Sequence, residues 1–249
     1  MKQGLLFILF LMLTCGSYAS QDYTAWWNTA NEMYKAKQYD SAVYYYTKIA
    51  ALNPQDEYVY YNIGNAHYKL NNIGLAVLNY EKALKINPNF DLATDNLYLT
   101  QNRINNRIQP VPKIFFVRWW HGLTSSSHTN TYALLSIVLF LAGIAYLILA
   151  RLRSIKIKLP IQAIASIFIL SILFVFLGFV SANKRVTSKY AVVIEHEAPL
   201  MLSPETGKSQ SLIPEGTKVE VTDNKTGWLE VILPDGRTGW LQSNTLGRI

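Results

Sequence analysis

The histidines are the side chains of this sequence best suited to acid–base or metal chemistry, but their positions suit neither. The four are scattered over three regions, with no neighbouring cysteine and no H-E-x-x-H or comparable ligand spacing: His67, His121, His128 and His196. The sequence has no G-x-S-x-G motif or phosphate-binding loop, and a helix start explains the carboxylates Asp91 and Asp95. The sequence therefore predicts no catalytic group, no metal site and no cofactor, in a protein that is not an enzyme.

A repeated pattern of large and small residues occupies the N-terminal third. Like residues recur 34 positions apart, at Tyr34 and Tyr68, Ala42 and Ala76, Tyr46 and Tyr80, and Pro54 and Pro88. Helical spacing of the large residues, with Gly64 and Ala83 between them, predicts pairs of closely packed helices. The stretch "YNIGNAHYKLNNIGLAVLNYEKALKINP" resembles the tetratricopeptide repeat. We expect an all-α domain over residues 22–108, with repeats at 23–56 and 57–90 and a capping helix over 91–108.

That resemblance implies a concave groove lined by the first helix of each repeat. The residues it places on this surface are Trp27, Asn31, Tyr34, Lys35, Tyr61, Asn62, Asn65, Tyr68 and Lys69. Asn amides can donate to and accept from a peptide backbone, and aromatic faces hold apolar side chains. The carboxylate-clamping members of the family have Lys where this sequence has Trp27 and Tyr61, so a free C-terminal carboxylate is not the expected ligand. Tyr34 and Tyr68 have a second interpretation, as packing residues between helices.

Two long uncharged stretches, residues 132–150 and 160–182, are each long enough to cross a bilayer. The loop between them, residues 151–159, carries four basic residues and is expected in the cytoplasm. Before them, the linker 109–131 contains the aromatic segment 114–121, which predicts a helix lying at the lipid headgroups with Trp119 and Trp120 as anchors.

Residues 1–19 have the features of a secretory signal peptide cleaved after Ala19. An uncleaved N-terminal anchor, or acylation at Cys15, are the alternatives. Export of the N-terminus places both flanking domains in the periplasm and makes the chain a two-pass inner-membrane protein. The formal charge of +7 gathers beside the apolar stretches, which argues against nucleic acid as a partner.

From residue 190 to residue 249 the apolar period changes to two, which predicts five or six short strands. Residues 234–236, Pro-Asp-Gly, predict a hairpin turn. The paired Gly-Trp steps at Trp228 and Trp240 resemble the bacterial SH3-like family, which implies a small all-β barrel. These two tryptophans either form a ligand surface or fill the barrel core.

The order of these modules resembles the BatE family of the Bacteroides aerotolerance operon. That resemblance implies a multidomain membrane protein that acts as a protein–protein interaction scaffold in an envelope stress response. Its implied partners are membrane or periplasmic proteins, among them the von Willebrand type A domain proteins of the BatA and BatB type, besides the lipid bilayer itself. The alternative function is an envelope anchor whose SH3-like domain binds peptidoglycan.

Overall fold

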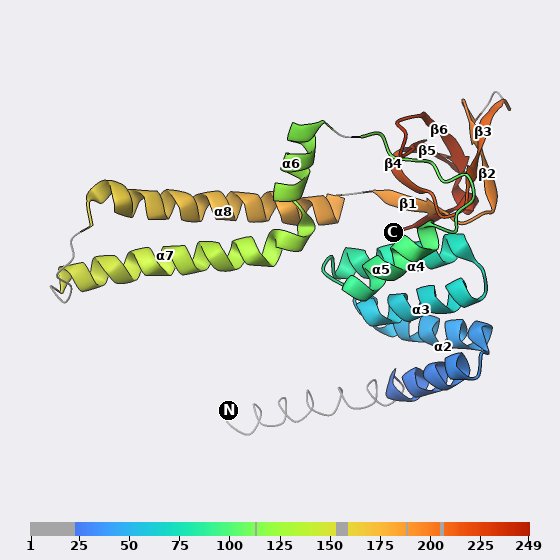
Figure 1. The fold of residues 1–249 in the computed structure, drawn as a ribbon, viewed down its shortest axis with the longest axis horizontal. Helices are drawn as coiled ribbons and strands as arrows, with labels where there is room; N and C mark the ends of the chain where they lie inside the picture. The colour runs from blue at the N-terminus through green and yellow to red at the C-terminus, as the bar shows by residue number, and fades with distance from the viewer. Residues whose placement is uncertain (1–22, 113, 153–158, 188, 205–206) are drawn as a thin grey trace, which may run out of the picture. The chain divides into compact units, whose positions relative to one another are not determined.

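The computed structural model describes residues 23–112, 114–152, 159–187, 189–204 and 207–249 (Figure 1). The chain divides into two compact units. One, the repeat–sheet unit, joins Met1–Val111 to Lys189–Ile249, and the other, the helical-pair unit, is Pro112–Ser188. The expected signal peptide, with Cys15, lies outside the described residues.

Helical hairpins form the N-terminal part of the repeat–sheet unit, as the sequence predicts. The first helix covers residues 23–35. It is followed by α2 (Tyr39–Leu52), α3 (Glu57–Lys69), α4 (Ile73–Ile86) and α5 (Asp91–Gln101). Asp56 caps α3, because its Oδ1 accepts from the amides of Tyr58 and Val59 at 2.9 and 3.3 Å.

The 34-residue period is visible in the backbone as well as in the side chains. Lys37 and Asn71 occupy equivalent positions after the first helix of each hairpin, and both have positive φ, 61° and 63°. A residue in this conformation ends a helix and reverses the chain. Because both repeats turn in the same way, their first helices line up on one side.

Seven antiparallel strands form the C-terminal part of the same unit. They are β1 (Tyr190–Val193), β2 (Glu197–Met201), β3 (Ser209–Pro214), β4 (Lys218–Lys225), β5 (Trp228–Ile232), β6 (Thr238–Gln242) and β7 (Leu246–Arg248). Their order in the sheet is β3-β2-β6-β5-β4-β1-β7. The predicted Pro-Asp-Gly hairpin is confirmed between β5 and β6, where Gly236 has φ +87°.

The helices and the sheet pack directly on each other through α4. Val77 and Leu78 of α4 share a buried apolar cluster with Val192 of β1. An ion pair joins Lys218 Nζ to Glu81 Oε2 at 2.6 Å. Three glycines let the backbones approach, because a Cβ on Gly74, Gly216 or Gly247 would lie within 2.8 Å of an atom across this interface.

A carboxylate from the sheet also caps α4. Glu215 Oε2 accepts from the backbone amide of Gly74 at 2.8 Å. Gly74 is the second residue of α4, so its amide has no acceptor within the helix. The sheet therefore stabilises the start of the helix on which it packs.

The capping helix expected over 91–108 is shorter than predicted, because α5 ends at Gln101. The following residues cross to the sheet, where Ile108 packs on the sheet core and the Val111 amide donates to the Pro234 carbonyl at 3.1 Å. The last repeat is thus covered jointly by α5 and the sheet. The helical and sheet parts thus belong to one compact unit.

The helical-pair unit consists of α6 (Phe115–Leu123), a short 3-10 turn, α7 (Thr129–Arg151) and α8 (Ile161–Thr187). Helices α7 and α8 run side by side in opposite directions (Figure 1). Gly143 lets Phe168 approach, and the Ser171 hydroxyl donates to the Ser136 carbonyl at 2.9 Å. Two segments, Phe115–Arg151 and Ile161–Lys184, are long and apolar enough to cross a membrane.

Candidate protein-binding groove

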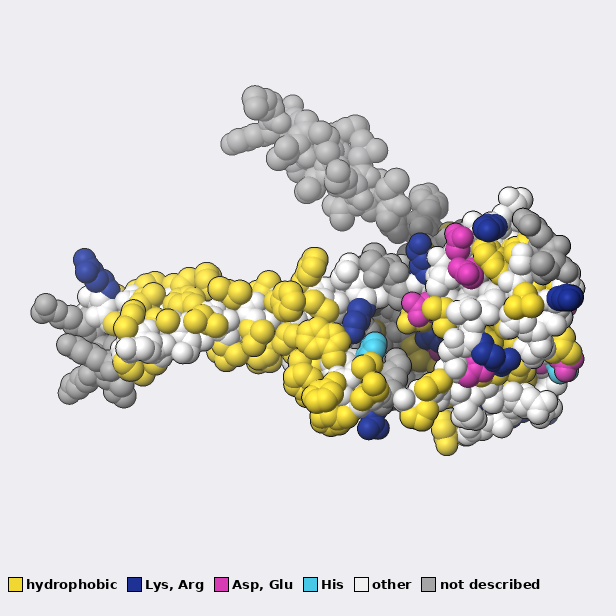
Figure 2. All heavy atoms as spheres, turned by 90° about the horizontal axis from the view of Figure 1, so that it is seen from above, with side chains coloured by type: hydrophobic (Ala, Val, Ile, Leu, Met, Phe, Trp, Pro, Cys, Tyr) yellow, Lys and Arg dark blue, Asp and Glu magenta, His cyan; other side chains and the backbone are white. Residues whose placement is uncertain are grey.

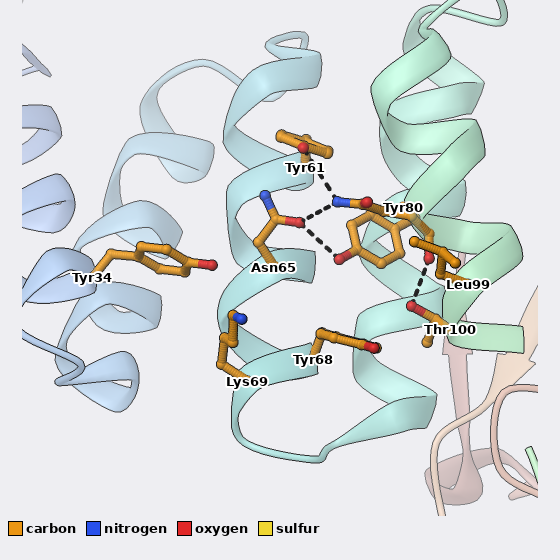
Figure 3. A pocket seen from close by; sticks show the side chains of 9 residues that line it. Tyr34, Tyr61, Asn65, Tyr68, Lys69, Tyr80, Leu99 and Thr100 are labelled. Atoms are coloured by element: carbon orange, nitrogen blue, oxygen red, sulfur yellow. Dashed lines mark hydrogen bonds between the residues drawn. The ribbon is translucent and has the colours of Figure 1, made fainter. Parts of the chain in front are cut away.

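A hollow of about 280 Å³ lies where the first helix, α3 and α5 face one another (Figure 3). Its lining residues are Tyr34, Tyr61, Asn65, Tyr68, Lys69, Tyr80, Asn96, Leu99 and Thr100. Figure 3 shows Tyr34 reaching from the first repeat toward Asn65, with Tyr68 and Lys69 at one end. The hollow is therefore built from both repeats and from α5.

One polar contact recurs in each repeat, and its second copy, between Tyr80 and Asn65, lies at the hollow. The Tyr46 hydroxyl donates to Asn31 Oδ1 at 2.6 Å, and the Tyr80 hydroxyl donates to Asn65 Oδ1 at 2.8 Å. The two tyrosines are almost completely buried. Burial raises the pKa of Tyr46 to about 12 and also raises the pKa of Tyr80, so both phenols are protonated at neutral pH and can donate.

Helix α5 completes this network. Asn96 Nδ2 donates to Asn65 Oδ1 at 2.8 Å and to the Tyr61 hydroxyl at 3.2 Å. Asn65 Oδ1 thus accepts two hydrogen bonds within the fold. Among the described residues, the Nδ2 group of Asn65 donates no hydrogen bond. With the hydroxyl protons of Tyr34, Tyr61 and Tyr68, the groove offers mainly donors.

Positive charge borders one end of the hollow. Lys69 lines it, and the guanidinium of Arg103 lies 4.8 Å from the centroid of the Tyr68 ring. Arg103 Nη2 also donates to Asn71 Oδ1 at 2.6 Å, which holds the stacked arrangement. A ligand segment rich in acceptors, such as backbone carbonyls or acidic side chains, suits this lining.

The structure brings together five of the nine residues predicted for the groove, and the other four do not line the hollow. Trp27 packs within the first repeat, stacked on Tyr23 at 6.0 Å and edge-on to Tyr46 at 5.9 Å. Asn31 is bonded to Tyr46, as described above. Lys35 is exposed and Asn62 is half-buried, both outside the ring of lining residues.

Sequence reasoning missed four lining residues: Tyr80, Asn96, Leu99 and Thr100. A signal for one of them was present, because Asn96 follows Asn62 by the same 34 positions that separate the repeats. Extending the repeat register into α5 would have assigned this helix to the groove wall as well as to the cap.

The two tryptophans considered for the sheet have different environments. Trp240 is 8% exposed, with Lys225 Nζ 5.0 Å from its ring centroid. Trp228 is half-buried at the start of β5. The burial of Trp240 favours its interpretation as a core residue.

Side chains suited to other chemistry are dispersed. Among the described residues, no three His, Cys, Asp or Glu side chains gather where they could hold a metal ion. His196 is paired with Glu215 at 3.0 Å, and His67 lies 3.5 Å from Asn72.

His67 is expected to make the repeat–sheet unit less stable in mild acid. Burial lowers its pKa below 6.5, and the nearby Asp40 opposes this only in part. The folded state therefore binds the proton less tightly than the unfolded chain, so stability falls as pH drops through about 6.5. Denaturation midpoints at pH 7.5 and pH 5.5 should differ less in His67→Gln than in the parent.

The pKa of His196 is shifted in the opposite direction, so its effect on stability must be removed before that of His67 is measured. Its hydrogen bond to Glu215 raises the pKa of His196, so its contribution is present at low pH and is lost as pH rises. His196→Gln removes this contribution, and His67→Gln is compared in that background. An unchanged pH dependence on replacing His67 would contradict the assignment.

Residues 57–90 match the family described as tetratricopeptide repeat. No curated protein matches the chain. Among solved structures, the chain is similar to one titled "TPR2B-domain:pHsp70-complex of yeast Sti1", with 17% sequence identity and a TM-score of 0.32, over 61% of this chain and 98% of that one. The chain contains a tetratricopeptide repeat beside an antiparallel sheet and two apolar helices long enough to span a membrane.

Proposed function

We propose that this chain is a membrane-anchored scaffold that binds a segment of a partner protein in its repeat groove. The observation that carries the proposal is the groove itself, in which five predicted residues from two repeats surround a hollow with unused donors. Tetratricopeptide repeats are protein-interaction modules, and their presence supports binding as the activity. An extended segment that supplies backbone carbonyls and acidic side chains is the ligand that suits these donors.

The anchor in this proposal is the pair α7 and α8. Both ends of residues 112–188 join the repeat–sheet unit, so a chain that crosses the bilayer twice there returns to the side it left. Contacts between α4 and the sheet support one common compartment for the two flanking parts. With export by residues 1–19, that compartment is the periplasm.

The resemblance in module order extends the proposal to a biological setting. In this setting the C-terminal sheet is an SH3-like domain and the partners are von Willebrand type A domain proteins of an envelope complex linked to aerotolerance. Trp240 is buried, so its ring offers a glycan little surface to stack on. Binding of peptidoglycan is therefore the less favoured function, and the crosslinking experiment below would detect it.

Photocrosslinking from the groove tests the binding activity. Photoreactive benzoylphenylalanine in place of Tyr68, in the full chain in its native membrane, is expected to capture a discrete protein. The same residue in place of Tyr44, which is 56% exposed on α2 away from the hollow, is the matched control. Lys69→Glu should weaken capture from position 68. Equal capture from both positions, or transfer to glycan alone, would contradict groove binding.

Cysteine labelling tests the topology independently. In a Cys15→Ser background, single cysteines replace Gln55 or Asn224, which are exposed on the helical and sheet parts. Both should react with a membrane-impermeant maleimide in intact spheroplasts. Labelling of only one before lysis would refute a common compartment.

A further inference from the structure

Helix α6 has a strongly two-sided surface that nothing in its own unit covers. Helical spacing puts Phe115, Phe116, Trp119, Trp120 and Leu123 on one face, with Arg118 and His121 opposite. None of its residues is buried, and Phe116 and Trp119 are 74% and 59% exposed. Such a surface needs an apolar partner, because large exposed apolar patches are unfavourable in water.

The geometry of α6 relative to α7 and α8 is fixed by bonds at its C-terminal end. The Tyr132 hydroxyl donates to the Leu123 carbonyl at 2.6 Å, and Lys184 Nζ of α8 donates to the Thr124 hydroxyl. Thr124 is completely buried at this junction. Within the unit, α6 stands across the axis of the α7–α8 pair at one end of it (Figure 1).

A helix in this position is parallel to the plane of any bilayer that α7 and α8 cross. Its apolar face then lies at the level where acyl chains meet headgroups, which is where Trp and Phe side chains are favoured. The apolar surface also continues from α7 and α8, whose exposed side chains are almost all hydrophobic (Figure 2). This continuity favours lipid over a second protein as the partner.

Charge identifies the kind of lipid. Residues 112–188 contain no Asp or Glu, while Lys and Arg occur at 113, 118, 151, 153, 156, 158, 184 and 185. Near α6 this places Arg118 on the exposed polar face and Lys184 at the junction. A basic surface without acidic residues is complementary to anionic headgroups, at about 1 kcal/mol for each basic residue near the surface.

We propose that α6 lies flat in the surface of an anionic phospholipid bilayer, with Phe115, Phe116, Trp119 and Trp120 in the acyl-chain boundary and Arg118 among the phosphates. The inference rests on the proposed crossing of the bilayer by α7 and α8. It adds a second contact with lipid, in the plane of the membrane, that fixes how the anchor is oriented.

Spin labels on single cysteines test this in the full chain, with Cys15 replaced by Ser, reconstituted into vesicles containing phosphatidylglycerol. Collision with oxygen reports acyl chains, and collision with a water-soluble nickel chelate reports solvent. Oxygen should dominate at positions 116 and 119, and nickel at 118 and 121. A label at Leu141 in α7, which is 57% exposed, is the reference for the spanning helix.

The outcomes separate this inference from the proposed anchor. Solvent access along all of α6, with oxygen dominant at position 141, overturns the inference and leaves the anchor intact. Solvent access at 141 overturns the anchor itself. Shielding of positions 116 and 119 from both reagents means that protein covers the face, which also overturns the inference.

Lipid composition tests the charge component separately. Replacing phosphatidylglycerol with phosphatidylcholine should lower the oxygen-to-nickel ratio at position 116 about twofold or more, as should Arg118→Gln in anionic vesicles. A ratio that is unchanged in both cases overturns the requirement for anionic headgroups.

Discussion

Leu78→Asp is expected to unfold the repeat–sheet unit, with a loss of at least about 4 kcal/mol. Leu78 lies on α4, is 6% exposed, and packs with Val77 and Val192 between the helices and the sheet. A carboxylate there loses the apolar contacts and gains no partner. Because α4 also packs on α3 and α5, the loss should spread to both parts of the unit in one transition.

Denaturant unfolding of a soluble chain, with a flexible linker in place of residues 112–188, gives the measurement. Leu92→Asp is the control, since Leu92 is 53% exposed in the first turn of α5, where an acidic residue is well tolerated. Gly247→Val tests the same contact from the sheet, because a Cβ at Gly247 would lie 2.3 Å from Leu78 Cδ2. A parent chain that unfolds in two separate steps would show that helices and sheet are not coupled.

Gly64→Val should disrupt the second repeat, at a cost of about 3 kcal/mol or more. A Cβ at Gly64 would lie 2.6 Å from Cε1 of Tyr80, whose ring is 1% exposed and cannot move aside. Displacing that ring also breaks the hydrogen bond from Tyr80 to Asn65 at the hollow. Stability and partner capture from position 68 should therefore be lost together.

Lys69→Val is the matched control for stability, since it places the same β-branched residue at an exposed position of the same helix. It should cost only a few tenths of a kcal/mol through helix propensity. If Gly64→Val and Lys69→Val have equal midpoints, the close packing of α3 on α4 is not what stabilises the repeat.

Local periodicity predicts most elements of this fold, although it indicates five or six strands where the sheet has seven. The 34-residue spacing predicted the hairpins, uncharged length predicted α7 and α8, and alternation predicted β4 and β5. In β5 the alternation is confirmed by burial of Leu229 and Val231. Each of these signals depends on residues a few positions apart, or on a repeat of them.

The contact between helices and sheet could not be predicted in the same way. Gly74 and Glu215 are 141 residues apart, and no periodic pattern links them. The sequence indicates that α4 has an apolar face, but not what covers it. The same reason explains why α5 was predicted too long, since the sheet takes over the role assigned to its last turns.

For the groove, the residue types indicate which side chains lie near the hollow better than they indicate which hydrogen bonds those side chains make. Tyr34, Tyr61 and Tyr68 all line the hollow. Asn31 and Asn65 were expected to present their amides to a ligand, yet their oxygens accept from Tyr46 and Tyr80. The common 34-residue spacing of both pairs is consistent with this contact, but the spacing alone does not distinguish a bond within the repeat from a shared surface.

The packing of α4 on a sheet made from the end of the chain has a consequence for biosynthesis. When the ribosome has completed α4, the strands that cover Val77 and Leu78 have not yet been made. At 5–20 residues per second, synthesis of the remaining chain takes roughly 10–30 s. During this interval the nascent helices have an apolar face that the sheet does not yet cover.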